Sequence, residues 1–294
     1  MRRSYRWMTL FAATSLVAAM AFALTACGDD DDDDGGSSSG DLVSANVSCK
    51  DLGVTAPARI KSAGKLVVAS DLSYAPMEFV KEGTNDPIGA DVDFANCIAE
   101  AWGVNADVQN TSFDAIIAAL QSSKADVIMS SMTASDERKK EIDFVEYFSA
   151  GSGILVKEGN PDKIKTIADL CGKKVAIQVG TVQIDEADEQ NAKCGDKKIE
   201  VQTFEQNTDT ITAVSTGRAT AALMDFPVAT YGASKVKGTE VVGEQYNTGN
   251  YGIAVRKDDG EVKTALEAAV KAMMDKGKYD EILKYWGLEA GSIK

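Results

Sequence analysis

The feature that most constrains the fold is a regular alternation of short apolar runs with helical patterns, which begins at Lys65. The apolar runs have the length of buried strands and occupy residues 65–70, 107–109, 125–129, 174–179, 199–203 and 219–224. Amphipathic patterns predict helices over residues 94–102, 113–120, 208–216, 262–273 and 279–286. Gly103 and Gly217 follow two of these patterns as C-terminal stop signals. The alternation predicts an α/β protein with mainly parallel sheets and helices on both faces.

The alternation falls into two units of about a hundred residues each, so we expect two lobes. In open α/β sheets, ligands bind outside the carboxyl ends of the strands. Three polar clusters lie at such ends: residues 70–78, residues 130–138, and Gln178 to Thr181 together with Met224-Asp225. The sequence therefore predicts a ligand cleft between the lobes.

Residues 1–40 are expected to form an export signal and a tether. Three Arg precede an apolar run of about 16 residues, which is shorter than the ~20 needed to span a bilayer. Leu24-Thr25-Ala26-Cys27 resembles a bacterial lipobox, in which the Cys is acylated. We expect a signal peptide over 1–26 and a lipid-anchored chain, on the outer face of the cytoplasmic membrane, that begins at Cys27. A plain secretory signal with a chance Cys is the alternative.

Residues 27–40 contain six consecutive Asp followed by Gly and Ser, a composition typical of a solvated linker. Export also permits disulfides. The four remaining cysteines allow three pairings. We expect Cys49 with Cys97 and Cys171 with Cys194, because this choice keeps each bridge inside one half of the chain.

Composition excludes several classes of function. The chain has no histidine, so it can form neither a Ser-His-Asp triad nor a His-ligated metal site, and it has no Cys-x-x-Cys spacing. A formal charge of −14 argues against binding nucleic acid through its phosphates. The glycine-rich loops of nucleotide and dinucleotide binding are missing as well. We therefore expect no cofactor, no metal and no catalytic residue.

Four segments carry a family resemblance. Residues 129–144 (MSSMTASDERKKEIDF) resemble the signature of the polar amino-acid-binding proteins of ABC importers, the family 3 extracellular solute-binding proteins. Three further features fall in the family's order and spacing: Tyr74 to Phe79, Gly89 to Asp93, and the pair formed by Gln178–Thr181 and Met224-Asp225. The similarity runs from about Gly64 to Gly287.

The resemblance implies a type II periplasmic-binding-protein fold, in which two hinge strands join the lobes near 149–151 and 248–251. Lobe 1 would comprise 41–149 plus 252–294, and lobe 2 would comprise 150–251. It also implies a monomer that binds a free amino acid by lobe closure and delivers it to the permease subunits of an ABC importer. Two alternatives stay open: a periplasmic cyclohexadienyl dehydratase on the same fold, and an amino-acid-sensing module that signals in trans.

The resemblance also assigns roles within the cleft. Arg138 would pair with the ligand's α-carboxylate, to which the backbone N–H groups of Thr133, Thr181 and Val182 would also donate. Asp225, assisted by Ser131, would accept from the α-ammonium. Tyr74 and Phe113 would form walls on either side of the ligand's side chain. Asp71 and Ser130 would offer polar contacts at the far end of that side chain. Asp71 and the acidic charge favour a polar or cationic side chain (Gln, Arg, Lys or His).

Two positions depart from the family pattern. Val182 lacks the hydroxyl that many relatives carry there, and Ala90 stands where an aromatic is common, which affects packing. Each assignment also has a local alternative. Arg138 lies within a run of consecutive charged residues and could be a surface charge, and Asp225 could cap the helix that contains Pro227. The two aromatic residues could belong to the hydrophobic core, and Ser130-Ser131 could form a simple turn. Asp71 and Glu78 could have structural roles, and Glu78 is the weaker candidate for ligand contact.

Overall fold

The computed structural model describes residues 43–294, so the predicted signal peptide, Cys27 and the linker lie outside the described residues. A sheet of eight strands in the order β5-β1-β6-β11-β7-β10-β8-β9 runs through the molecule. Its strands are β1 (Lys65–Ser70), β5 (Asn105–Asn110), β6 (Val127–Ile128), β7 (Ile142–Lys157), β8 (Lys174–Gln178), β9 (Glu200–Phe204), β10 (Ala221–Asp225) and β11 (Thr239–Arg256). The outer strands form two parallel groups, β5-β1-β6 and β10-β8-β9.

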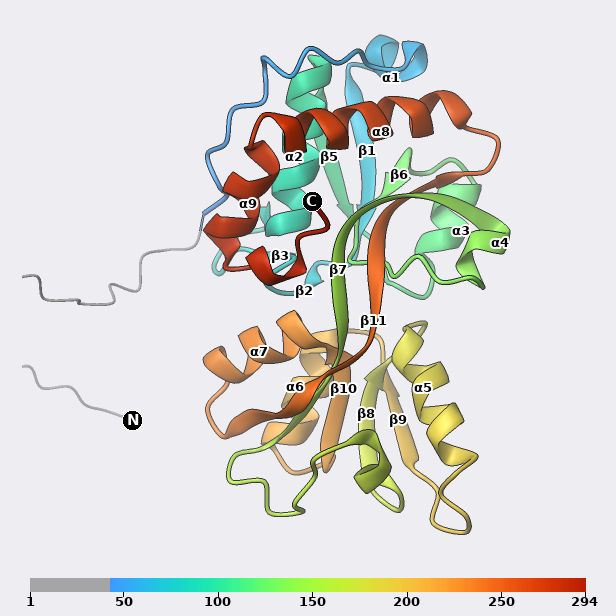
Figure 1. The fold of residues 1–294 in the computed structure, drawn as a ribbon, viewed down its shortest axis with the longest axis vertical. Helices are drawn as coiled ribbons and strands as arrows, with labels where there is room; N and C mark the ends of the chain where they lie inside the picture. Colours follow the sequence, from blue (N-terminus) through green and yellow to red (C-terminus); the bar gives the residue numbers. More distant parts are fainter. Residues whose placement is uncertain (1–42) are drawn as a thin grey trace, which may run out of the picture. The chain divides into compact units, whose positions relative to one another are not determined.

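The two groups belong to two lobes, which β7 and β11 connect as a long antiparallel pair (Figure 1). The first lobe also holds α1 (Ala58–Ala63), α2 (Ala90–Trp102), α3 (Ile116–Gln121), α4 (Arg138–Glu141), α8 (Gly260–Asp275), α9 (Lys278–Trp286), η2 (Glu289–Gly291) and a small antiparallel sheet of β2 (Ser73–Tyr74), β3 (Glu78–Val80) and β4 (Pro87–Ile88). The second lobe holds η1 (Ile167–Leu170), α5 (Val182–Asn191), α6 (Asn207–Ser215) and α7 (Phe226–Lys235). From Val43 to the C-terminus, none of the helices has the length and apolar character that crossing a bilayer requires.

The two hinge strands join the parallel groups of the two lobes into one mixed sheet. β7 and β11 are hydrogen-bonded to each other and to one strand of each parallel group, so the ladder is continuous across both lobes. In the β7–β11 pair the register shifts between Val242 and Tyr246, between Tyr246 and Gly249, and between Tyr251 and Gly252. Such irregularities bend and twist a strand locally.

A close backbone approach fixes the start of α2. Gly89 has φ +130°, and a Cβ on it would lie 2.2 Å from the Met77 carbonyl oxygen. Only glycine allows this contact. Ala90, which follows it, is fully buried in the first-lobe core, in agreement with a packing role. The approach brings the carboxyl groups of Glu78 and Asp91 together beneath the cleft.

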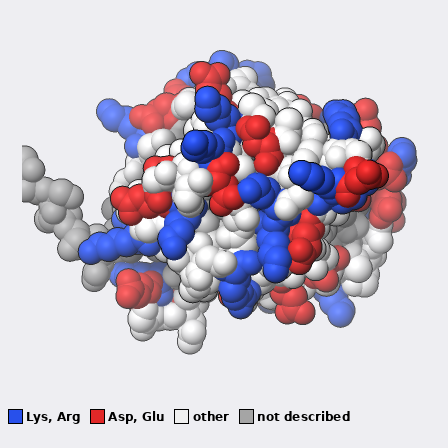
Figure 2. Space-filling view, turned by 90° about the horizontal axis from the view of Figure 1, so that it is seen from below, with Lys and Arg blue, Asp and Glu red and all other residues white. Residues whose placement is uncertain are grey.

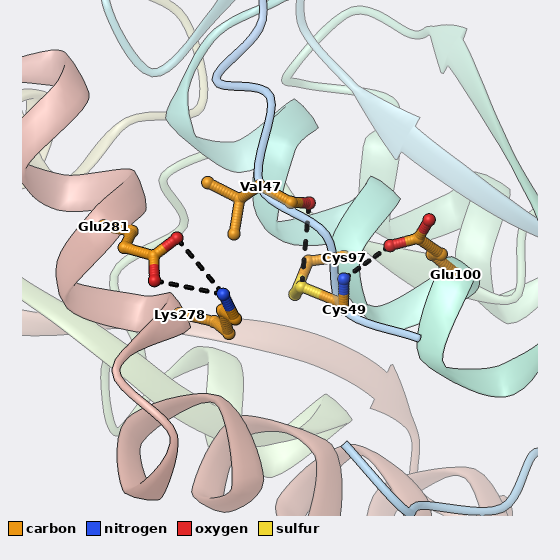
Figure 3. The surroundings of a disulfide bond; sticks show 6 residues. All are labelled: Val47, Cys49, Cys97, Glu100, Lys278 and Glu281. Carbon is orange, nitrogen blue, oxygen red and sulfur yellow. Dashed lines mark hydrogen bonds and ion pairs between the residues drawn. A yellow bond between two sulfur atoms is a disulfide. The ribbon is translucent and has the colours of Figure 1, made fainter. Parts of the chain in front are cut away.

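Both predicted disulfides are present. Cys49 bonds to Cys97 and Cys171 to Cys194, with Cα–Cα distances of 5.2 and 5.4 Å. The first bridge ties the segment before α1 to α2, and Glu100 of α2 accepts from the Cys49 N–H at 2.5 Å (Figure 3). The pairing predicted from the halves of the chain is therefore confirmed.

The surface mixes charges of both signs. On the face in Figure 2, Lys and Arg side chains lie next to Asp and Glu side chains. Ion pairs of the second lobe include Lys173 with Asp162 and Lys174 with Glu200. This pattern differs from the basic surfaces by which proteins bind nucleic acid.

Candidate functional site

A narrow pocket with a cavity volume of about 10 Å³ lies between the lobes. Its lining residues are Asp71, Tyr74, Glu78, Phe113, Ser130, Ser131, Thr133, Arg138, Gln178, Thr181, Val182, Gln183 and Asp225. Asp71, Ser130, Gln178 and Asp225 follow or end β1, β6, β8 and β10, so the carboxyl ends of the parallel strands build the pocket. The structure thus brings all ten residues predicted for ligand binding to one place. It adds Glu78, Gln178 and Gln183.

Arg138 turns away from its charged neighbours and into the pocket. Its guanidinium donates from Nη1 to the Thr133 carbonyl at 2.9 Å and from Nη2 to the Gly180 carbonyl at 3.0 Å. The second of these bonds crosses from the first lobe to the second. Glu137, Lys139 and Lys140 remain exposed, whereas Arg138 is half-buried and lies 5.3 Å from the centroid of the Phe113 ring. Arg138 is therefore not one of the run's surface charges.

Asp225 takes the N-cap position of α7, but its side chain makes no capping bond. Its carboxylate accepts instead from Gln183 Nε2 at 2.7 Å and from the Tyr251 hydroxyl at 2.6 Å. Burial raises the pKa of this carboxyl group, and the hydrogen bonds and the charge of Arg138 oppose the rise. The capping alternative holds for the backbone only, and the carboxylate faces the pocket.

Asp71 is hydrogen-bonded at every acceptor position. Its Oδ1 accepts from the Ser73 N–H and hydroxyl at 3.1 and 2.7 Å, and its Oδ2 accepts from the Phe113 N–H at 3.0 Å and Gln178 Nε2 at 2.9 Å. Four bonds fill the usual capacity of a carboxylate. Burial raises the pKa of Asp71. Because Gln178 belongs to the other lobe, a ligand side chain that reaches Asp71 also meets this amide.

Ser130 and Ser131 both direct their hydroxyl hydrogens to Glu78. Ser130 Oγ donates to Glu78 Oε1 at 3.1 Å, and Ser131 Oγ donates to Oε2 at 3.0 Å. The two hydroxyls therefore offer only acceptor lone pairs to a ligand, which suits an ammonium group. Ser131 has φ +48°, a left-handed conformation that non-glycine residues adopt at a cost.

Glu78 and Asp91 form a buried pair of carboxyl groups below these serines. Asp91 accepts from the Ser131 N–H at 2.8 Å and the Tyr147 hydroxyl at 2.6 Å, and it is hydrogen-bonded to Glu78. Burial and the charge of Asp91 raise the pKa of Glu78 well above its usual range, and burial raises that of Asp91 to about 6. The raised pKa of Glu78 favours its protonated form, which can donate to Asp91.

The N-terminus of α5 forms the opposite wall. Val182 is the first helical residue, and Thr181, the N-cap, donates its hydroxyl to the Gln178 carbonyl at 2.7 Å. The first N–H groups of a helix have no partner inside it and favour an anion. With the Thr181 hydroxyl engaged and no hydroxyl at position 182, backbone N–H groups are the donors on this wall.

The two aromatic residues do more than line the pocket. The Tyr74 hydroxyl accepts from the Asp225 N–H at 3.0 Å, a bond between the lobes, and burial beside Asp225 raises its pKa well above the usual range. Phe113 is half-buried and lies under the Arg138 guanidinium. Among residues 43–294, no group of three or more Cys, Asp or Glu side chains could hold a metal ion.

Sequence reasoning missed three lining residues. Gln178 lies in a segment that carries the family resemblance, so its position was visible but its contact with Asp71 was not. Glu78 was the weaker candidate because its serine partners lie about fifty residues away in the chain. Gln183 carried no signal at all, since nothing local marks the second residue of α5 as a partner of Asp225.

Known proteins resemble the chain over most of its length. The L-cystine-binding protein TcyJ of Escherichia coli is 32% identical over 231 residues, which cover 78% of this chain and 84% of that protein. The arginine-binding extracellular protein ArtP of Bacillus subtilis is 30% identical over 287 residues, which cover 96% and 97%.

Solved structures agree with these relatives. The ancestral amino acid-binding protein AncCDT-1, described as a precursor of cyclohexadienyl dehydratase, superposes with a TM-score of 0.71 and 38% identity, covering 78% of this chain and 97% of that chain. An ancestral arginine-binding protein bound to arginine superposes with a TM-score of 0.72 and 35% identity, covering 76% of this chain and 98% of that chain. Residues 66–289 match the bacterial extracellular solute-binding proteins, family 3. The chain therefore belongs to this family and has the type II periplasmic-binding-protein fold.

Proposed function

We propose that the protein binds a free α-amino acid between its lobes and delivers it to the permease subunits of an ABC importer. The observation that carries the proposal is a guanidinium and a carboxylate, Arg138 and Asp225, that come from different lobes and line one pocket. A zwitterion matches both charges, and burial makes the match specific. The α-carboxylate would pair with Arg138 and the N–H groups that open α5. The α-ammonium would pair with Asp225 and the serine oxygens.

We propose a polar or cationic side chain for the ligand. Asp71, Asp225 and Arg138 are the ionised groups of the pocket when Glu78 is protonated, so the lining carries one negative charge in excess. A monocationic amino acid would neutralise it, and Gln178 also offers an amide to an uncharged polar side chain. ArtP is named for arginine and TcyJ for cystine, and an ancestral relative was solved with glutamine.

The lobes of the proposed mechanism are residues 41–149 plus 252–294, and residues 150–251. They would close around the amino acid and exclude water from its charges. Two hydrogen bonds between the lobes would belong to the closed arrangement: Arg138 donates to the Gly180 carbonyl, and Gln178 donates to Asp71. Closure then presents one shape to the importer.

A thermal-shift screen of the refolded protein against the twenty amino acids tests this proposal. Ligand at 100 times its dissociation constant adds about 2.7 kcal/mol to stability, which raises Tm by roughly 5–10 °C for a domain of this size. Arg138→Ala should abolish the shift, since breaking a buried pair costs about 3–5 kcal/mol. Lys140→Ala, which removes an exposed charge two residues away, should retain it.

The absence of a shift with all twenty amino acids would contradict amino-acid binding. An equal loss in Lys140→Ala would contradict the specific role of Arg138. We propose that the protein has no enzymatic activity. Release of carbon dioxide and water from prephenate would contradict this and support the dehydratase alternative. Unimpaired uptake of the ligand in a deletion strain would favour the sensing alternative over transport.

We further propose that the protein is a monomer tethered to the outer face of the cytoplasmic membrane by acylation of Cys27, its only contact with the membrane. The support is the lipobox-like tetrapeptide that ends at Cys27 and the acidic, Gly- and Ser-rich stretch behind it. Radiolabelled palmitate should enter the wild-type protein and not Cys27→Ser. Release of the wild-type protein into the medium without label would contradict the anchor.

A further inference from the structure

A buried chain of hydrogen bonds leads from Asp225 away from the pocket. Gln183 Nε2 donates both to Asp225 Oδ1 at 2.7 Å and to Ser152 Oγ at 2.9 Å. Ser152 Oγ donates to Glu186 Oε1 at 2.8 Å. Ser152, Gln183 and Asp225 are each at most 6% exposed. The hydrogen-bonded chain is therefore buried, and it has a carboxyl group at each end.

Ser152 lies where the hinge strands meet the pocket. It is the register partner of Asp225 on β10 and of Tyr246 on β11, at the point where the β7–β11 register shifts. Gly151, its neighbour, donates its N–H to the Gln245 side chain of β11 at 3.0 Å. The chain therefore joins Asp225 to the irregular part of the hinge.

The far end of the chain is incompletely hydrogen-bonded. Glu186 Oε2 and the Tyr246 hydroxyl are both buried and have no hydrogen-bond partner among residues 43–294. Native proteins leave few such atoms, and the exceptions often belong to groups that change protonation or contacts. Glu186 also lines a hollow of about 570 Å³, which gives its proton a route to solvent.

We propose that Glu186 is a positioning residue of the ammonium subsite, which holds Asp225 in place through Ser152 and Gln183 and releases a proton to solvent when an amino acid binds. The inference rests on the proposed function. The α-ammonium neutralises the charge of Asp225, and this removes a repulsion that keeps Glu186 protonated. Ionised Glu186 is also the stronger acceptor for Ser152, and the polarised chain then holds Gln183 and Asp225 more firmly.

The electrostatic surroundings agree with this direction. Burial, and to a smaller extent the charge of Asp225, raise the pKa of Glu186 to about 7, against the opposing hydrogen bond from Ser152. The other titratable groups of the hollow are Lys165, Glu189, Lys193, Glu244 and Tyr246. Because ligand binding lowers the pKa of Glu186, the ionised form binds the ligand more tightly. Affinity therefore rises with pH through about 7.

Calorimetric titration of L-arginine and L-glutamine in buffers of different ionisation enthalpy measures the proton directly. If the pKa falls by about one unit, about half a proton leaves midway between the two values, and affinity rises about tenfold from below to above them. The chain has no histidine, so no imidazole contributes. Any proton that the ligand itself gains or loses on binding is the same for all variants, so it cancels when the variants are compared.

Four variants separate charge from position. Glu186→Gln keeps an acceptor for Ser152 but cannot ionise, so it should match the affinity of the wild type at low pH, lack the rise in affinity with pH and lose the proton release. Glu186→Ala and Ser152→Ala should each weaken binding about tenfold. Their combination should cost no more than either alone, because both break one chain. Glu189→Gln, on the same helix and in the same hollow but outside the chain, should behave as wild type.

Unaltered proton release in Glu186→Gln would overturn the proposal and point to Asp91, whose pKa is also raised to about 6. Unaltered affinity in Glu186→Ala would overturn the positioning role. Wild-type binding without proton release would refute this inference and leave amino-acid binding intact. Absence of binding by any amino acid at any pH would refute the proposed function itself.

Discussion

Glu78 is a carboxyl group with no exposed surface, and among residues 43–294 it forms no ion pair with a Lys or Arg. Its raised pKa has a consequence for stability. A carboxyl group that is protonated in the folded state and ionised in the unfolded state destabilises the fold as pH rises above its unfolded value of about 4.3. Glutamine keeps the shape and the donor to Asp91 without this cost.

We therefore expect Glu78→Gln to gain stability relative to wild type as pH rises from 5 to 8, by at most about 1.4 kcal/mol per pH unit. Unfolding in urea at each pH measures the difference. Glu82→Gln, an exposed residue beyond β3, should show no such trend. A gap between wild type and Glu78→Gln that stays constant with pH would mean that Glu78 is ionised in the fold.

At the same scale, the pocket residues were predictable where family motifs marked them. Arg138 and Asp225 each had a local alternative of equal merit, and only their partners in space decide between the readings: the carbonyls of Thr133 and Gly180 for Arg138, and Gln183 and Tyr251 for Asp225. The saturation of Asp71 was not predictable, because its donors lie up to 107 residues away. Hydrogen-bond partners of this kind follow from the fold and leave no local pattern.

At the scale of elements, the predicted strands and helices correspond to β1, α2, β8, α6 and α9 within a few residues, because each has a clear period and a glycine or polar boundary. The helix expected over 113–120 begins only at Ile116, and the strand expected over 125–129 is reduced to Val127–Ile128. β7 escaped pattern reading because its burial does not alternate: it lies buried on both faces over much of its length. Helix and strand signals therefore describe the lobes well and the hinge poorly.

At the scale of the whole molecule, contacts remote from the pocket set how readily the lobes close. Tyr231 of α7 lies 6.0 Å, between ring centroids, from Phe79 of the first lobe, and Phe79 lies 5.9 Å from Trp286 of α9. Tyr231 does not line the ligand pocket. A ligand that binds the closed form has an apparent affinity proportional to the fraction of protein that is closed. Weakening this contact lowers that fraction and therefore the apparent affinity, although no contact with the ligand changes.

We expect Tyr231→Ala to weaken binding of every amino acid by the same factor of about five, because an aromatic pair of this kind contributes about 1 kcal/mol. Tyr285→Ala is the matched control, since its ring contacts Trp286 within the first lobe and faces solvent. Calorimetry gives the affinities, and small-angle scattering with and without ligand gives the degree of closure. Equal affinity in Tyr231→Ala and wild type, or a factor that differs between ligands, would show that the aromatic contact does not govern closure. A uniform factor would instead place the control of affinity in the balance between open and closed lobes, separate from the pocket residues that choose the ligand.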